Sequence, residues 1–161
     1  PEGQMHFQDF WVSLKGKPPV SGISFSGMDR ARPSPAFLEL LEKEKTVLIG
    51  PSNPVTSIGP ILALPGVREM MAKKRVVAVS PLLADRPASG PAAEFMAALG
   101  APAGDEGVRS LLGKVDLFVV DKKSSYVGKC QRMSTRMKTR KESRKVAEEL
   151  LAIIEDAPGQ E

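Results

Sequence analysis

The stretch of sequence whose residue types are best suited to chemistry is a loop at positions 50–60. Pro51 and Pro54 stiffen this loop, so less conformational entropy is lost when a ligand is held. Gly50 permits a positive φ or the close approach of another backbone. The loop has no lysine of the kind that marks a Walker motif. Its hydrogen-bonding side chains are all uncharged, and they belong to Ser52, Asn53, Thr56 and Ser57.

Two interpretations of this loop stay open. A helix is expected to follow it, and a helix amino terminus offers unpaired N–H groups and a partial positive charge. In the first interpretation these groups and the loop side chains form an anion site, most naturally for a phosphate. In the second, the segment is a proline-rich turn in which Thr56 or Ser57 simply caps the helix.

A second group of candidate residues lies near the start of the sequence. Phe7 and Trp11 are four residues apart with Gln8 between them, which would allow both rings to stack against a flat ligand. The more common role for such rings is in the core, and we expect that role here. His6 is a candidate general base, but a lone histidine at this position is more often incidental.

The carboxy-terminal third of the sequence is rich in positive charge. Residues 129–145 hold eight basic side chains and one acidic one, whereas the whole chain has a net charge of +4. The positive charge is therefore local, and it indicates either an anionic partner or a solvated helix face. Within this stretch Arg136 and Lys138 are candidate phosphate contacts. Cys130 has no histidine near it in sequence, so we do not expect a catalytic thiol.

Short apolar runs rich in β-branched residues alternate with segments of helical periodicity. Such runs are typical of buried parallel strands. Ser34 is suited to cap a helix that begins with Pro35. The predicted strands are 20–25, 46–49, 75–79 and 117–120, and the predicted helices are 35–43, 57–73 with a break near 65–66, 91–99 and 141–155.

This alternation predicts an α/β fold of the Rossmann-like kind, with a mostly parallel sheet and helices on both faces. In such sheets ligands bind beyond the carboxyl ends of the strands. The loop after residue 49, Ser80 and Asp121 all lie at those ends. Asp121 is therefore a candidate contact for a metal or a ribose, although an aspartate that stabilises a turn or caps a helix fits equally well.

The composition excludes several classes of protein. The chain has one cysteine and one histidine, which rules out an internal disulfide and a conventional zinc cluster. No apolar run approaches the roughly 18 residues that a membrane-spanning helix needs. The first ten residues do not have the pattern of a signal peptide, so we expect a cytoplasmic protein.

One segment carries a family likeness. The run at 49–62, Ile-Gly-Pro-Ser-Asn-Pro-Val-Thr-Ser-Ile-Gly-Pro-Ile-Leu, closely resembles the signature loop of the CofD family. Segments 64–68, 77–81 and 144–147 resemble that family in the same order. Ala84 and Asp85 depart from the family pattern, which usually has glycines there. Residues 1–161 are thus expected to form a single α/β domain, the carboxy-terminal part of a longer transferase.

The resemblance implies a function. Members of the CofD family are 2-phospho-L-lactate or phosphoenolpyruvate transferases of coenzyme F-420 biosynthesis. They use a guanylylated phospho-acid donor and a deazaflavin alcohol as acceptor, release GMP, and depend on Mg²⁺. By this resemblance residues 50–57 hold the donor's phosphates or nucleotide. The flat ligand that Phe7, Gln8 and Trp11 would contact, in the alternative to a core role for the rings, is then the deazaflavin. The resemblance also implies a homodimer, and Mg²⁺ ligands outside this chain.

Two other functions remain as alternatives. The first is a nucleotide-binding or regulatory CofD-like module without catalysis, because the chain lacks an evident cluster of carboxylates. The second is a nucleic-acid binder that uses residues 129–145. Only Tyr126 lies near that stretch for base stacking, whereas interleaved aromatic residues would be expected, so binding to nucleic acid is disfavoured.

Overall fold

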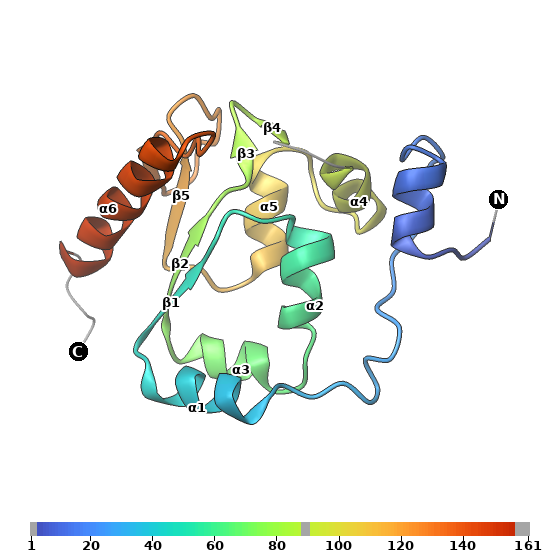
Figure 1. The fold of residues 1–161 in the computed structure, drawn as a ribbon, viewed down its shortest axis with the longest axis horizontal. Helices are drawn as coiled ribbons and strands as arrows, with labels where there is room; N and C mark the ends of the chain where they lie inside the picture. Colours follow the sequence, from blue (N-terminus) through green and yellow to red (C-terminus); the bar gives the residue numbers. More distant parts are fainter. Residues whose placement is uncertain (1–2, 88–90, 157–161) are drawn as a thin grey trace.

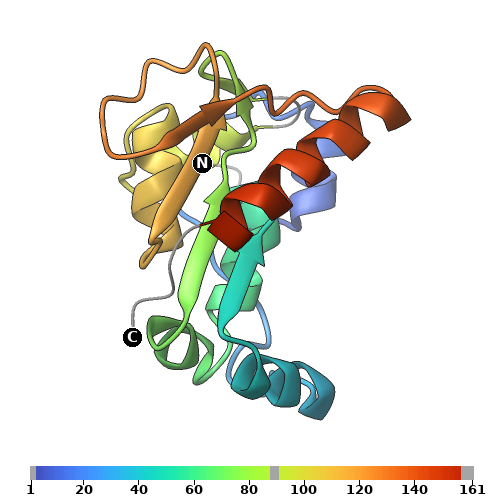
Figure 2. The same ribbon diagram turned by 90° about the vertical axis from the view of Figure 1, so that its left-hand side faces the viewer.

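A parallel four-stranded sheet forms the centre of the molecule (Figures 1 and 2). The computed structural model describes residues 3–87 and 91–156. Hydrogen bonding between neighbouring strands is parallel throughout, and the register places Ile49 beside Ala78 and Asp121 beside Met133. The strand order is β1 (Thr46–Ile49), β2 (Arg75–Val79), β5 (Leu117–Asp121) and β6 (Gln131–Met133).

Alternate side chains of the central strands face two separate cores. Val76 and Ala78 of β2 belong to the larger core, whereas Val77 and Val79 belong to the smaller one. Of the helices in the described residues, only α6 (Arg140–Asp156) covers the smaller core, on one side of the sheet (Figure 1). The other side is covered by α1 (Pro35–Lys43), α2 (Gly59–Leu62), α3 (Val67–Ala72), α4 (Ala92–Ala98) and α5 (Asp105–Leu112). The prediction of a Rossmann-like α/β fold with helices on both faces is confirmed.

The helix boundaries follow local signals in the sequence. The Ser34 hydroxyl accepts the Phe37 amide at 3.2 Å, and Pro35 is the first residue of α1. Gly66 has a φ of 80° and separates α2 from α3, as the break predicted near 65–66 requires. Among the helices of the described residues, none is both long and apolar enough to cross a bilayer.

One predicted strand is wrong, because residues 20–25 form no strand. Ile23 and Phe25 are half-buried while their neighbours are exposed, so the alternation seen in the sequence is real. Ile23 packs against the larger core, and the ring of Phe25 lies against Gly59. The alternation in the sequence therefore reflects alternate side chains that pack on the helical layer, and not a strand of a sheet.

Several short elements have no counterpart in the sequence-based prediction. They are the π-helical turn η1 (Asp9–Ser13), the antiparallel hairpin of β3 (Leu82–Leu83) and β4 (Arg86–Pro87), helix α5, and strand β6. Helix α5 depends on Gly107, where a Cβ atom would fall 1.8 Å from the carbonyl oxygen of Pro102. Strand β6 lies inside the basic stretch 129–145, which is therefore only partly helical.

Candidate ligand pocket

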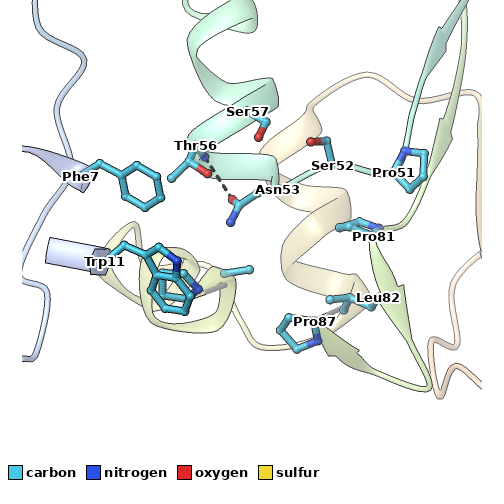
Figure 3. A pocket seen from close by; sticks show the side chains of 12 residues that line it. Phe7, Trp11, Pro51, Ser52, Asn53, Thr56, Ser57, Pro81, Leu82 and Pro87 are labelled. Atoms are coloured by element: carbon cyan, nitrogen blue, oxygen red, sulfur yellow. Dashed lines mark hydrogen bonds between the residues drawn. The ribbon is translucent and has the colours of Figure 1, made fainter. Parts of the chain in front are cut away.

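A cavity of about 430 Å³ opens at the carboxyl ends of β1 and β2 (Figure 3). It lies beside the loop that the sequence singled out, which supplies one side of its lining. The hairpin β3–β4 and the start of α4 supply another side, and two aromatic rings from the amino-terminal segment complete it. The lining residues are Phe7, Trp11, Pro51, Ser52, Asn53, Thr56, Ser57, Pro81, Leu82, Pro87, Pro91 and Ala92.

Asn53 organises the loop. Its side-chain oxygen accepts the amide of Val55 at 2.9 Å and that of Thr56 at 3.1 Å. Its backbone carbonyl accepts the amides of Ser57 at 3.1 Å and Ile58 at 3.0 Å. These bonds start the π-helical turn η2 (Pro54–Ile58), which continues directly into α2.

Because Asn53 caps η2, the groups that can bind an anion differ from those expected from the sequence. All four amides from Val55 to Ile58 donate to Asn53, so they are not available to a ligand as the sequence-based interpretation required. Because the Asn53 oxygen is turned toward the helix, its NH₂ group points into the cavity (Figure 3). The side-chain donors that the cavity lining offers a ligand are this NH₂ group, the hydroxyls of Ser52, Thr56 and Ser57, and the indole N–H of Trp11.

The structure shows no conformational reason for a glycine at position 50. Gly50 is absent from the cavity lining, and it does not adopt a positive φ. A Cβ atom at this position would meet nothing within 4 Å. Thr56 and Ser57 are not the cap of the helix either, because Asn53 takes that position.

The aromatic residues near the amino terminus fall into two groups, one in the core and one lining the cavity. Phe10 is the buried one, and its ring packs against Phe95 with centroids 5.5 Å apart. Phe7 and Trp11 are 36% and 40% exposed and line the cavity, so the expectation that they are core residues is wrong. Phe7 still touches the core through an edge-to-face contact with Phe95 at 5.6 Å. Gln8 is exposed and does not line the cavity.

Comparison with known proteins shows the family to which the chain belongs. The family model described as 2-phospho-L-lactate transferase CofD matches residues 1–157, nearly the whole chain. The chain belongs to the CofD family. A 2-phospho-L-lactate transferase of Methanosarcina mazei is 50% identical over 123 residues, which cover 76% of this chain and 41% of the relative.

Two further members of the CofD family match over more of the chain. The 2-phospho-L-lactate transferase of Methanosarcina acetivorans is 40% identical over 163 aligned residues, covering 96% of this chain and 53% of the relative. That of Methanopyrus kandleri is 39% identical over 169 aligned residues, covering 98% and 54%. This CofD-family chain thus spans about half the length of the curated relatives it matches.

The carboxylates at the strand ends of this CofD-family chain are engaged in holding loops together. Asp121 is buried, and its Oδ1 atom accepts the amides of Lys123 at 3.1 Å and Ala84 at 3.3 Å. Asp105, which the sequence did not single out, is buried at the start of α5 and accepts the hydroxyls of Ser80 and Ser124. Asp121 therefore fits the turn-stabilising alternative.

The described residues do not fit a Mg²⁺ site. None of those that line the cavity carries a charge. Over residues 3–87 and 91–156, no group of three or more histidine, cysteine, aspartate or glutamate side chains is arranged to hold a metal ion. Magnesium is normally bound through one or two carboxylates together with substrate phosphates.

The remaining candidates lie away from the cavity lining. The Arg136 side chain is 3.4 Å from a carboxylate oxygen of Glu142, and the backbone amide of Lys138 donates to the same carboxylate at 2.8 Å. His6 accepts the Gln8 amide through Nδ1 at 3.2 Å and does not line the cavity. Cys130 is half-buried against the larger core. The structure therefore brings together the loop and the two aromatic rings, and leaves the basic residues elsewhere.

Proposed function

We propose that this chain forms the donor-binding part of a CofD-type transferase. The enzyme moves a 2-phospho-lactyl or enolpyruvyl-phosphate group from a guanylylated donor to a deazaflavin alcohol. In that reaction the hydroxyl oxygen of the alcohol attacks the donor phosphorus, the bond from that phosphorus to the guanylyl oxygen breaks, GMP leaves, and the hydroxyl proton passes to solvent. The support comes from membership of the CofD family and from its relatives, which are named 2-phospho-L-lactate transferases.

The observation that carries the proposal is the division of the cavity into two chemically different sides. Uncharged donors from Asn53, Ser52 and Thr56 line one side, and apolar groups such as Trp11 and Pro87 line the other (Figure 3). Such a cavity suits a ligand that joins a phosphate to a flat, weakly polar ring. The partial positive charge at the start of η2 and α2 adds to the attraction for the phosphate even though its amides are capped.

The lack of charge in the cavity lining bears on catalysis. Phosphoryl-type transfer depends on positioning and on compensation of the charge that the phosphates carry. The lining residues can position a ligand but cannot compensate such a charge. We therefore infer that Mg²⁺ and its carboxylate ligands come from residues beyond those described, which agrees with relatives of about twice this length.

The sheet offers a place for that additional part of the enzyme. β1 is an outer strand of the four-stranded sheet. Val47 and Ile49 face the larger core, so Leu48 faces the side that α6 covers, yet Leu48 is 45% exposed. An edge strand that presents an exposed leucine is suited to pairing with a further strand.

The substitution Asn53→Asp tests the donor site. Aspartate caps helices as well as asparagine does, so η2 should form normally. The NH₂ donor is lost and a negative charge is placed against the phosphate, so we expect GMP to bind at least about tenfold more weakly, measured by calorimetry. Equal affinity in the two proteins would remove the basis of the proposal.

Ser34→Asp is the matched control. Ser34 caps α1 through its side chain as Asn53 caps η2, so this substitution also replaces a neutral cap with a charged one. Ser34 does not line the cavity, and the control should bind GMP as the unmodified chain does. A similar loss in both variants would show that overall charge, and not the Asn53 donor, governs binding.

Transfer itself needs a separate assay. Release of GMP and formation of the phosphodiester product should be followed with this chain alone and within a polypeptide of the relatives' length. We expect GMP binding in both cases and transfer only in the longer polypeptide. Binding without transfer in both would favour the alternative of a CofD-like module that binds nucleotide without catalysis.

A further inference from the structure

The hairpin β3–β4 holds an unfavourable backbone conformation at its turn. Ala84 and Asp85 are the two residues between the strands, and their φ angles are 49° and 64°. Two-residue hairpin turns with positive φ at both positions normally contain asparagine, aspartate or glycine. Alanine has no preference for this region, so contacts from outside the turn must hold it in place.

Those contacts come from the last residue of β5 and from the loop that follows it. Both carboxylate oxygens of Asp85 accept the backbone amide of Ser125, each at 3.0 Å. The Ala84 amide donates to Asp121 at 3.3 Å. The tip of the hairpin is thus attached to a segment about forty residues further along the chain.

The segment that receives Asp85 is itself held firmly. Arg132 of β6 donates to the carbonyl oxygen of Ser124 at 2.6 Å and to that of Tyr126. The hydroxyl of Ser124 donates to the buried Asp105. Residues 124–126 are therefore fixed from two further elements, which makes them an anchor for the hairpin.

The hairpin forms the wall of the cavity that faces Asn53. Leu82 and Pro87 are paired across the two strands, and both line the cavity. Figure 3 places them across the cavity from Asn53 and Thr56. The position of the hairpin therefore sets the space between the polar donors and the apolar wall.

We propose that Asp85 is a positioning residue, whose carboxylate fixes the β3–β4 hairpin as one wall of the cavity and so raises the affinity for the ligand that Asn53 contacts. The inference rests on the proposed function only for the choice of ligand. The contacts of the hairpin stand independently of what the cavity binds.

The ionisation of Asp85 agrees with this role. Its pKa is lowered from the ordinary value, chiefly because the Ser125 amide donates to the carboxylate; Arg132 contributes its positive charge, and the side chains of Ser125 and Ser124 add hydrogen bonds. Because the pKa is lower in the folded chain than in the unfolded one, the ionised carboxylate stabilises the attachment at any pH above the ordinary aspartate pKa of about 3.9. The attachment weakens only as the pH falls below that value, through the lowered pKa. The hairpin is therefore held at neutral pH.

Three variants of the full 161-residue chain, labelled with ¹⁵N, test the inference. Asp85→Gly removes the attachment and leaves a residue that accepts positive φ, whereas Asp85→Asn retains one acceptor oxygen. Ala84→Gly is the control, because it places glycine in the same turn and keeps the backbone amide that reaches Asp121. The measurements are the affinity for GMP and the pH dependence of the Ser125 amide resonance.

We expect Asp85→Gly to abolish the acid titration of the Ser125 amide and to weaken GMP binding roughly tenfold, as the loss of a hydrogen bond to a charged group suggests. Asp85→Asn should retain most of the affinity, and Ala84→Gly should match the unmodified chain. Unchanged GMP affinity in Asp85→Gly, with the Ser125 titration gone, would overturn the positioning role.

Failure of the proposed function gives a different result. If the unmodified chain does not bind GMP, the resonances of the Trp11 indole and the Asn53 side-chain amide still report on the cavity. Changes in both resonances in Asp85→Gly but not in Ala84→Gly would support the inference. Their constancy in Asp85→Gly would overturn it.

Discussion

The two loops at the carboxyl edge of the sheet are held in opposite ways. In the loop after β1, Asn53 accepts four hydrogen bonds, and their donors are backbone amides two to five residues further along the chain. The loop after β5 also has local bonds, from the amides of Lys123 and Tyr126, but it is joined to the rest of the fold by Asp85, Asp105 and Arg132, which lie far away in sequence or on another element. The bonds described for the first loop are all local, whereas the second loop depends in addition on partners from the rest of the fold.

The loops also differ in what they offer a ligand. The loop after β1 turns neutral donors toward the cavity. The loop after β5 has the carboxylate of Asp121, but that group accepts backbone amides. A carboxylate at the ligand edge of a parallel sheet is thus not by itself evidence of a metal site, because the same edge is where loops must be joined.

The largest effect that this comparison predicts concerns the buried junction, by which we mean the hydrogen bonds that Asp105 accepts from Ser80 and Ser124. Asp105→Ala should lower the free energy of unfolding by about 3 kcal/mol, because the buried hydroxyls of Ser80 and Ser124 lose their acceptor. Urea denaturation measures this change.

The neighbouring substitution Glu106→Ala is the control for Asp105→Ala. Glu106 is exposed in the same first turn of α5, so its removal should change the free energy of unfolding by less than about 0.5 kcal/mol. Equal losses in the two variants would mean that only the charge at the start of the helix matters and that the buried junction contributes little.

A smaller effect is expected from the local loop. Asn53→Ala should lower the free energy of unfolding by about 1 kcal/mol, the usual value for a lost helix cap. The penalty is limited because Asn53 is only half-buried and water in the cavity can replace its oxygen. Thermal unfolding should show Asn53→Asp close to the unmodified chain, and a loss above about 3 kcal/mol for Asn53→Ala would contradict the local character of this loop.

The same contrast explains what could be predicted from the sequence. Strands β1, β2 and β5 are apolar runs, and α1 has its cap and proline, so each follows from adjacent residues. The loop after β1 can likewise be predicted from adjacent residues, because its prolines and polar side chains follow a short apolar run. Asn53 was expected to offer a donor to a ligand, but its additional role as the cap of η2 depends on a turn geometry that the residue types alone do not specify.

The elements that were missed depend on distant partners. Strand β6 has three residues, one of them buried, and its hydrogen bonds to β5 decide its conformation. Of the two residues in the hairpin turn, only Asp85 is typical of such turns, and Ala84 gives no signal of one. For residues 20–25 the alternation predicts a strand, although side-chain packing on a helical layer gives the same pattern. Asp105 had no signal in the sequence, because its importance comes from two serines on other loops.

The smallest predicted effect tests whether the distant anchors hold the hairpin against its own preference. Ala84 adopts a φ of 49°, in a region of backbone conformation that glycine accepts more readily than alanine. Ala84→Gly removes the steric cost of that conformation, about 1–2 kcal/mol, but makes the unfolded chain more flexible, at a cost of about 0.5–1 kcal/mol. The free energy of unfolding should therefore rise by about 0.5 kcal/mol in urea denaturation. A loss of stability would show that the turn is not strained at Ala84, and that the anchors at Asp121 and Ser125 follow the hairpin rather than hold it.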